Sequence, residues 1–181
     1  LYRAESAGPS KDRKLTPRIT STAKALFGIY LLLTVACALS YFAAGMSPFD
    51  ALCHAFSTVA IGGFSTHDAS LGYYEENAIL LVSSLFMLFS AINFGLHFVA
   101  LQRRTARVYA RDSETAFFVT VIALATVVTC SLLLTTETLG VEDSLIHGFF
   151  QTISIATTTG FTTQDFSICP LFFPILLLML S

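Results

Sequence analysis

The sequence predicts an all-α membrane protein built from parallel repeats of helix, pore loop and helix. Of the 181 residues, 54% are hydrophobic and only 12% are charged, and the mean hydropathy is +0.71. Soluble domains carry about 25% charged residues, so this composition favours a lipid environment. A second observation is a pair of loops rich in Gly, Ser and Thr, residues 58–66 and 155–163, which share identities at an offset of 97 residues, as between Gly63 and Gly160.

Three segments are long and apolar enough to cross a bilayer. Residues 25–45, 77–102 and 115–136 contain no Asp, Glu, Lys or Arg, and each can supply the roughly 20 apolar residues that a spanning helix requires. A fourth segment, 170–181, is too short to span. Because it stops early and the chain opens on Leu1, we expect a fragment of a longer polypeptide.

The charged residues predict the orientation. All ten Lys and Arg residues lie within residues 3–24 and 103–111, which the positive-inside rule assigns to the cytoplasm. The loops that hold the repeated motifs contain acidic residues and no basic ones, so they are expected outside, where negative charge would concentrate cations. The expected organisation is a cytoplasmic basic segment (1–24), a pore repeat (25–102), a cytoplasmic loop (103–114) and a second pore repeat truncated in its last helix (115–181).

Each repeat also contains an apolar segment about half as long as a span. Residues 48–59 and 144–156 are predicted to be re-entrant half-helices. Pro48 suits the first turn of such a helix, and Asp50 and Asp143 lie near the starts, where the helix dipole favours negative charge. The opposite ends would direct partial negative charge into the membrane, toward a cation.

The loops that follow the half-helices predict an ion-selectivity filter. Gly62 and Gly63 break the first helical pattern, and residues 157–160 break the second. Irregular backbone at membrane depth is tolerated where it lines an aqueous cavity, and there its carbonyl oxygens can replace the hydration shell of a cation. A Gly pair alone is equally typical of a turn or close helix packing, and a Thr run of a strand or a capping cluster. Their repetition in the same span order favours the filter.

The loop sequences resemble those of a known transporter superfamily. AIGGFSTHDAS at residues 60–70 and ATTTGFTT at residues 156–163 are similar to the second and third filter loops of the Trk/Ktr/HKT superfamily of potassium transporters, especially its bacterial Trk uptake subunits. The resemblance implies four repeats in one chain around a pseudo-fourfold pore, with K⁺ as the transported ion and no organic cofactor. The K⁺-binding positions would be Ile61, Gly62, Gly63, Thr158, Thr159 and Gly160.

The resemblance also implies properties that the residues themselves do not indicate. These are a multi-pass location in the bacterial inner membrane, a homodimer, and a cytosolic nucleotide-binding regulatory subunit. It further implies a gating loop within the final helix of the third repeat, which would begin beyond Ser181.

Other site classes lack support in the sequence. No P-loop, dinucleotide-binding fingerprint or nucleophile triad is present, so no enzyme, catalytic residue or nucleic-acid partner is predicted. The His and Cys residues lack metal-ligand spacing, so no metal beyond K⁺ is expected. Asn93, Gly95 and His97 interrupt an apolar run and are expected to pack between helices. Phe64 and Phe161 follow the filter glycines and are expected to pack behind the loops.

Taken together, these patterns predict potassium uptake through a channel-like pore, in which backbone carbonyls select K⁺ as it moves down its electrochemical gradient. Two alternatives stay open. One is a sodium-preferring member of the same superfamily, and the other is a non-conducting membrane assembly subunit whose loops only pack.

Overall fold

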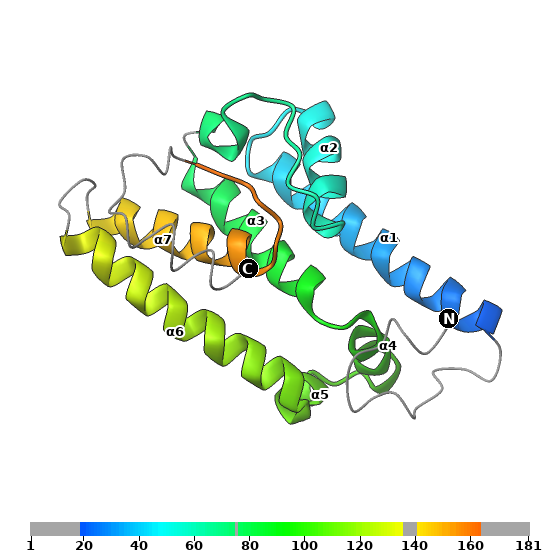
Figure 1. Ribbon diagram of the computed structural model, residues 1–181. Helices are drawn as coiled ribbons and strands as arrows, with labels where there is room; N and C mark the ends of the chain where they lie inside the picture. Colours follow the sequence, from blue (N-terminus) through cyan, green and yellow to red (C-terminus); the bar gives the residue numbers. More distant parts are fainter. Residues whose placement is uncertain (1–18, 75, 136–140, 164–181) are drawn as a thin grey trace.

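The computed structural model describes residues 19–74, 76–135 and 141–163, and all the regular secondary structure in these ranges is helical (Figure 1). The expected apolar segment 170–181, Asp165, and the basic residues from Arg3 to Arg18 lie outside the described residues. The elements, in chain order, are α1 (Ile19–Ala43), α2 (Pro48–Val59), the 3₁₀-helix η2 (Ser70–Tyr73), α3 (Asn77–Ala91), α4 (Phe94–Arg103), α5 (Arg107–Arg111), α6 (Ser113–Thr135) and α7 (Val141–Ala156).

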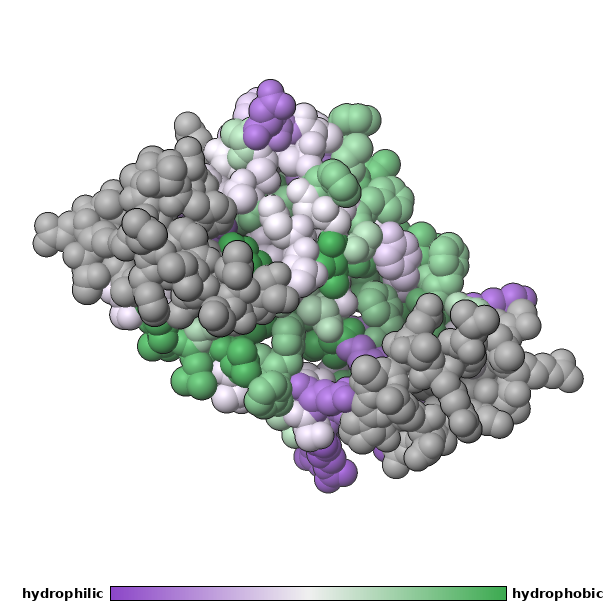
Figure 2. Space-filling view, viewed as in Figure 1, coloured by the Kyte–Doolittle hydropathy of each residue, from purple (hydrophilic) through white to green (hydrophobic). Residues whose placement is uncertain are grey.

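Among the described residues, two helices are long and apolar enough to cross a membrane. They are the segments Ser21–Ala43 of α1 and Ser113–Ser131 of α6, and a third crossing is available if α3 and α4 form one bent span. Figure 2 shows hydrophobic residues over the α1 side, with hydrophilic residues gathered above them near the loop after α2 and below them near α5 and the start of α1. The surface therefore has the banded polarity of a membrane protein.

The second expected span is not one continuous helix. The sequence predicted a helix over residues 77–102, whereas the structure bends by 93° between α3 and α4. Ile92 is extended (φ −75°, ψ 143°), and the side chain of Asn93 accepts a hydrogen bond from the Gly95 N–H at 2.8 Å as the N-cap of α4. Asn is a strong N-cap residue, and this local bond competes with continuation of the preceding helix.

His97 stabilises this bend from one turn inside α4. Its Nε2 lies 2.8 Å from the carbonyl oxygen of Phe89, which also accepts from the Ile92 N–H at 3.3 Å where α3 ends, and its Nδ1 lies 2.8 Å from the Tyr109 hydroxyl of α5. The Phe89 carbonyl can only accept, so Nε2 carries the proton and Nδ1 accepts from Tyr109. The expected packing role of His97 is thus a hydrogen-bonded link between α3, α4 and α5.

The helices form two similar units around one core. In Figure 1, α1 and α6 run in the same direction with α3 reversed between them, as parallel repeats require. The short α2 packs on α1 and α3, and α7 packs on α6 and α3. Tyr41 of α1 is fully buried, and its hydroxyl lies 2.7 Å from Thr58 Oγ1 of α2. The core therefore holds each half-helix against the long helix that precedes it.

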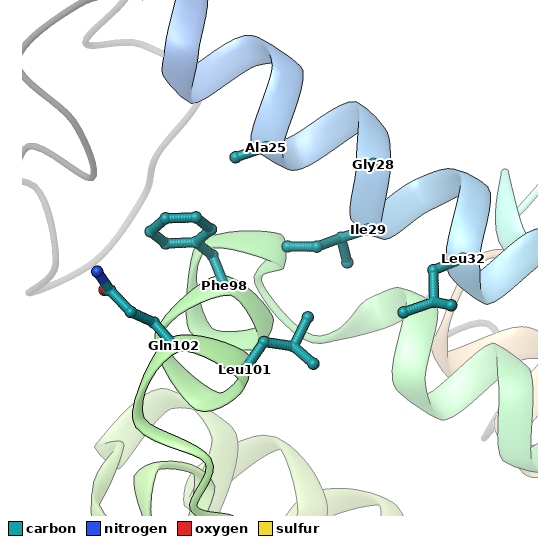
Figure 3. Close-up of a pocket in the computed structure, with 7 residues that line it drawn as sticks. All are labelled: Ala25, Gly28, Ile29, Leu32, Phe98, Leu101 and Gln102. Carbon is teal, nitrogen blue, oxygen red and sulfur yellow. The ribbon is translucent and has the colours of Figure 1, made fainter.

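An apolar groove of about 370 Å³ separates α1 from α4 (Figure 3). Ile29 and Leu32 extend into it from α1, and Phe98 and Leu101 extend from α4. The groove follows from the bend at Asn93, because α4 turns away from the line of α3 and meets α1 at one end.

Candidate ion-selectivity filter

The two half-helices end with the same capping motif. Beyond α2, the Gly62 N–H donates to the Ser57 carbonyl at 2.7 Å and the Ile61 N–H donates to Thr58 at 3.2 Å. At an offset of 97 residues, the Thr159 N–H donates to Ser154 at 2.9 Å and the Thr158 N–H donates to Ile155 at 2.8 Å. This pair of bonds is the Schellman motif, in which the residue at C′ adopts left-handed backbone angles. The first half-helix therefore ends at Val59, before the glycines.

The residues at C′ are Ile61 and Thr158, where glycine is the usual choice. Their φ values are +55° and +60°. Left-handed backbone costs a residue with a Cβ about 1 to 2 kcal/mol, and a β-branched residue there is unusual. Backbone strain of this kind concentrates at functional sites, where the surrounding structure maintains it.

The left-handed conformation then recurs two residues later in both loops. Gly63 has φ +66° and Gly160 has φ +84°, whereas the intervening Gly62 and Thr159 lie outside this region. Alternating handedness turns successive peptide groups the same way, as in backbone nests that align consecutive N–H groups. Carbonyl oxygens aligned on the opposite side of such a backbone are the arrangement that a cation-binding loop needs.

The two loops touch where Gly63 lies against the backbone of Thr159 and Gly160. A Cβ added to Gly63 would overlap the carbonyl oxygen of Thr159 and lie 2.9 Å from its carbonyl carbon. Glycine is required here both for its φ and for the close approach of two backbones. A Cβ added to Gly160 would meet nothing within 4 Å among the described residues. Gly63 of the first repeat is therefore covered by the neighbouring loop, whereas the equivalent Gly160 of the second repeat is open in the described residues.

Farther out, the second loop runs along η2 of the first repeat (Figure 1). The Gly72 N–H donates to the Thr162 carbonyl at 3.2 Å, and the Thr162 N–H donates to Ser70 Oγ at 3.3 Å. A Cβ on Gly72 would lie 2.5 Å from the Thr163 carbonyl oxygen. At η2 the two repeats therefore meet through close backbone contacts and one hydrogen bond to the Ser70 side chain.

Phe161 and Phe64 occupy equivalent positions in different environments. Phe161 is fully buried, with its ring centroid 6.1 Å from that of His54 in the preceding repeat, and its carbonyl accepts from Ser154 Oγ at 2.7 Å. Phe64 is 81% exposed. Phe161 is therefore packed as expected, whereas Phe64 is not covered by any of the described residues.

Asp50 lies at the outer end of α2 and accepts several hydrogen bonds. Thr66 Oγ1 donates to Oδ1 at 2.6 Å, and Ser47 Oγ donates to Oδ2 at 2.7 Å. These hydrogen bonds, of which the one from Thr66 has the largest effect, hold the pKa of the Asp50 carboxyl below its usual value. The ionised carboxylate therefore stabilises the folded state at neutral pH, and this contribution is lost only as pH falls through the lowered pKa.

Comparisons with known proteins agree with this geometry. The family model described as "TrkH: Cation transport protein" matches residues 1–181. The chain belongs to the TrkH family. It is 54% identical over 177 residues to the Trk system potassium uptake protein TrkH of Halomonas elongata, covering 98% of this chain and 37% of that protein. It is 50% identical over 180 residues to TrkH of Escherichia coli K12, again covering 98% and 37%.

A solved structure shows the same fold. The crystal structure of the potassium transporter TrkH from Vibrio parahaemolyticus superimposes with a TM-score of 0.88 at 49% sequence identity, covering 91% of this chain and 36% of that one. The predicted superfamily and all-helical membrane fold are thus confirmed. The chain spans about 37% of the length of the TrkH relatives that it matches.

The structure brings the six predicted filter residues of this TrkH-family chain together as two adjacent loops. Sequence reasoning missed the residues that hold the outer ends of those loops. At the 97-residue offset Asp50 corresponds to His147 and His54 to Gln151, so the partners differ even though Thr66 and Thr163 are identical. The detectable signal was the repeated Thr, since a retained hydroxyl implies a partner in each repeat.

Proposed function

We propose that this chain contributes two of the filter loops through which a longer TrkH-family protein takes up K⁺. The carbonyl groups of residues 61–63 and 158–160 would bind the dehydrated ion, and the negative ends of the α2 and α7 dipoles would favour it. One observation carries the proposal: both loops have the same capping bonds and the same alternation of φ, although Ile61 and Gly62 are replaced by Thr158 and Thr159. A backbone geometry kept through changes of side chain supports carbonyl ligands.

The packing supports a ring of such repeats. In α7, Ile153 is fully buried, and Ile146 and Phe149 pack against the same core. The equivalent residues of α2 are exposed by 46 to 69%, and they are Phe49, Leu52 and Phe56. Because α7 packs on α3 of the preceding repeat, the bare face of α2 has the position at which another repeat would dock.

The surroundings of Gly63 and Gly160 also support a ring of repeats. Gly63 is covered by the Thr159 backbone, whereas the matching edge of Gly160 is open, and Phe64 is exposed where Phe161 is buried. One further repeat on each side would cover Phe64 and Gly160. Four repeats around a pseudo-fourfold axis satisfy this requirement, and the relatives are long enough to contain the additional repeats.

The remaining elements of the proposal concern location and partners. Residues 103–114 would face the cytoplasm of a bacterial inner membrane, and the loops after α2 and α7 would open to the outside. The full-length protein would form a homodimer and bind a cytosolic nucleotide-binding regulatory subunit, and Arg103, Arg104 and Arg107 lie on the side proposed for it. The proposed repeats are residues 25–102 and 115–181, and the protein is proposed to have no enzymatic activity.

The orientation has a direct test. A single Cys introduced at Arg104, on the C-cap of α4, is expected to react with an impermeant thiol reagent only after the membrane is opened, and a Cys at Asp68 is expected to react from outside. The four native cysteines of the sequence, Cys37, Cys53, Cys130 and Cys169, are replaced beforehand as the background control. Reaction of both introduced thiols from one side would contradict the proposed topology.

The ion and its ligands are tested together in the full-length protein. We expect K⁺ flux with a permeability ratio strongly in favour of K⁺ over Na⁺, and we expect Thr158→Val to change that ratio less than Gly160→Ala. The valine keeps the shape and the β-branch of Thr158 and removes only the hydroxyl, whereas alanine adds a methyl group at a residue with φ +84°.

Reversal potentials at matched membrane expression measure this ratio. Na⁺ preference in the unmodified protein would favour the sodium-transporting alternative, and the absence of flux would favour the non-conducting assembly subunit. A collapse of selectivity in Thr158→Val with a normal ratio in Gly160→Ala would mean that side-chain hydroxyls, not carbonyls, select the ion.

A further inference from the structure

In each repeat, a threonine at the end of the filter loop contacts a residue in the first two turns of the half-helix that precedes the loop. We call this contact the threonine tie. In the first repeat Thr66 Oγ1 donates to the Asp50 carboxylate at 2.6 Å across 16 residues. In the second repeat Thr163 Oγ1 lies 2.9 Å from His147 Nδ1, also across 16 residues. The two contacts occupy equivalent positions at the 97-residue offset, with a carboxylate in one repeat and an imidazole in the other.

A second contact one helical turn later reinforces each tie. His54 is buried, with Nδ1 2.8 Å from the Asp50 carbonyl oxygen and Nε2 2.9 Å from Ser65 Oγ. The carbonyl can only accept, so Nδ1 carries the proton and Nε2 accepts from Ser65, whose oxygen accepts from the His67 N–H at 3.1 Å. At the matching position, the Gln151 Nε2 group donates to Thr163 Oγ1 at 3.0 Å.

The contact between Thr66 and the Asp50 carboxylate is surrounded by more interactions than the contact between Thr163 and His147. Asp50 also accepts from Ser47, the N-cap of α2, and His67 Nε2 lies 3.6 Å from Asp50 Oδ1. The His67 ring stacks on Tyr73 with centroids 3.7 Å apart. Hydrogen bonds to an ionised carboxylate are shorter and stronger than those between neutral groups. The Asp50 tie therefore connects the helix start, the outer loop and η2 in one network.

We propose that Asp50 and Thr66, and equivalently His147 and Thr163, are positioning residues that set the ion selectivity of the filter without touching the ion. The inner end of each loop is held by its Schellman bonds and the outer end by the threonine tie. The strained residues Ile61 and Thr158 lie in the inner part of these anchored segments. Removing the outer tie releases one end, so the carbonyls lose the spacing that distinguishes K⁺ from a smaller cation. This inference rests on the proposed transport function.

The test uses the full-length protein with Thr66→Val, Thr66→Ser, Asp50→Ala and the double variant of Asp50→Ala with Thr66→Val. We expect Thr66→Val to lower the K⁺ to Na⁺ permeability ratio about tenfold while K⁺ flux and membrane expression persist. Thr66→Ser should restore the ratio because it keeps the hydroxyl. The double variant should be no worse than the more severe single variant, since both remove one tie. Thr163→Val should give a loss of the same kind.

Thr120→Val is the control, because Thr120 Oγ1 donates to the Ala116 carbonyl one turn back on the exposed face of α6, away from the loops. A role limited to stability would lower expression and total flux and leave the ratio unchanged, and this result would overturn the proposal. If Thr66→Val prevents membrane insertion, Asp50→Ala decides, since it removes both acceptor oxygens of the tie and leaves Thr66 in place, and an unchanged ratio there would also overturn the proposal. If the unmodified protein selects K⁺ and the variants have the same permeability ratio, only the positioning role of the tie is refuted. If the unmodified protein shows no K⁺ flux, the proposed transport function itself is refuted.

Discussion

Gly63→Ala is expected to abolish selective K⁺ uptake by the full-length protein. The added methyl group would overlap the Thr159 carbonyl oxygen, one of the proposed ligands, and backbone atoms cannot move aside as a flexible side chain can. The substitution also places a Cβ on a residue with φ +66°. Both filter loops are therefore displaced by a change in one of them. Reversal potentials and K⁺ uptake at matched membrane expression measure the effect.

Two other glycines provide controls for Gly63→Ala. Gly28 on α1 has no atom within 4 Å of an added Cβ, so Gly28→Ala should leave uptake and selectivity intact. A Cβ on Gly72 would lie 2.5 Å from the Thr163 carbonyl oxygen, so Gly72→Ala disturbs the same interface outside the filter. We expect Gly72→Ala to reduce the amount of folded protein more than its ion preference. Equal K⁺ to Na⁺ ratios in Gly63→Ala and the unmodified protein would refute the filter assignment.

Phe161→Ala is expected to cost about 3 to 5 kcal/mol of stability, the range for deleting a buried aromatic side chain. Phe161 is fully buried at the junction of the repeats, and its ring lies against His54. Phe64→Ala should have a comparable cost in the full-length protein, although Phe64 is 81% exposed in the described residues. The reason is that a further repeat would cover Phe64 as the first repeat here covers Phe161.

Thermal unfolding of the purified full-length variants compares the two costs. Phe117→Ala is the matched control, since Phe117 is 73% exposed on α6, outside the proposed filter loops, and its loss should change stability little. A large effect of Phe161→Ala together with a negligible effect of Phe64→Ala would contradict the ring of repeats, because it would show that nothing covers the second position.

Local patterns predicted the half-helices well. The expected segment 48–59 coincides with α2, because Ser47 caps it, Pro48 suits its first turn and the apolar run ends at Val59. The expected segment 144–156 ends where α7 ends but starts three residues late, since α7 begins at Val141. That difference is typical of helix starts, where propensity changes gradually. The filter ligands at residues 61–63 and 158–160 stay a prediction.

The bend at Asn93 shows where local patterns failed. Hydropathy over residues 77–102 is uniform enough for one span, so composition favours a single helix. The N-cap bond of Asn93 and the link from His97 to the Phe89 carbonyl decide otherwise. The bond from His97 to the Phe89 carbonyl joins two helices, so the preferences of neighbouring residues alone do not predict it.

The sequence by itself determined the membrane class, the family and the extents of the two half-helices, because each depends on composition or on residues close together in the chain. Only the tertiary structure decided the left-handed conformations of Ile61 and Thr158, the burial of Phe161 beside an exposed Phe64, and the ties from Thr66 to Asp50 and from Thr163 to His147. These features depend on which groups meet across a turn or between repeats. Such contacts can keep one geometry while the residue types that make them change.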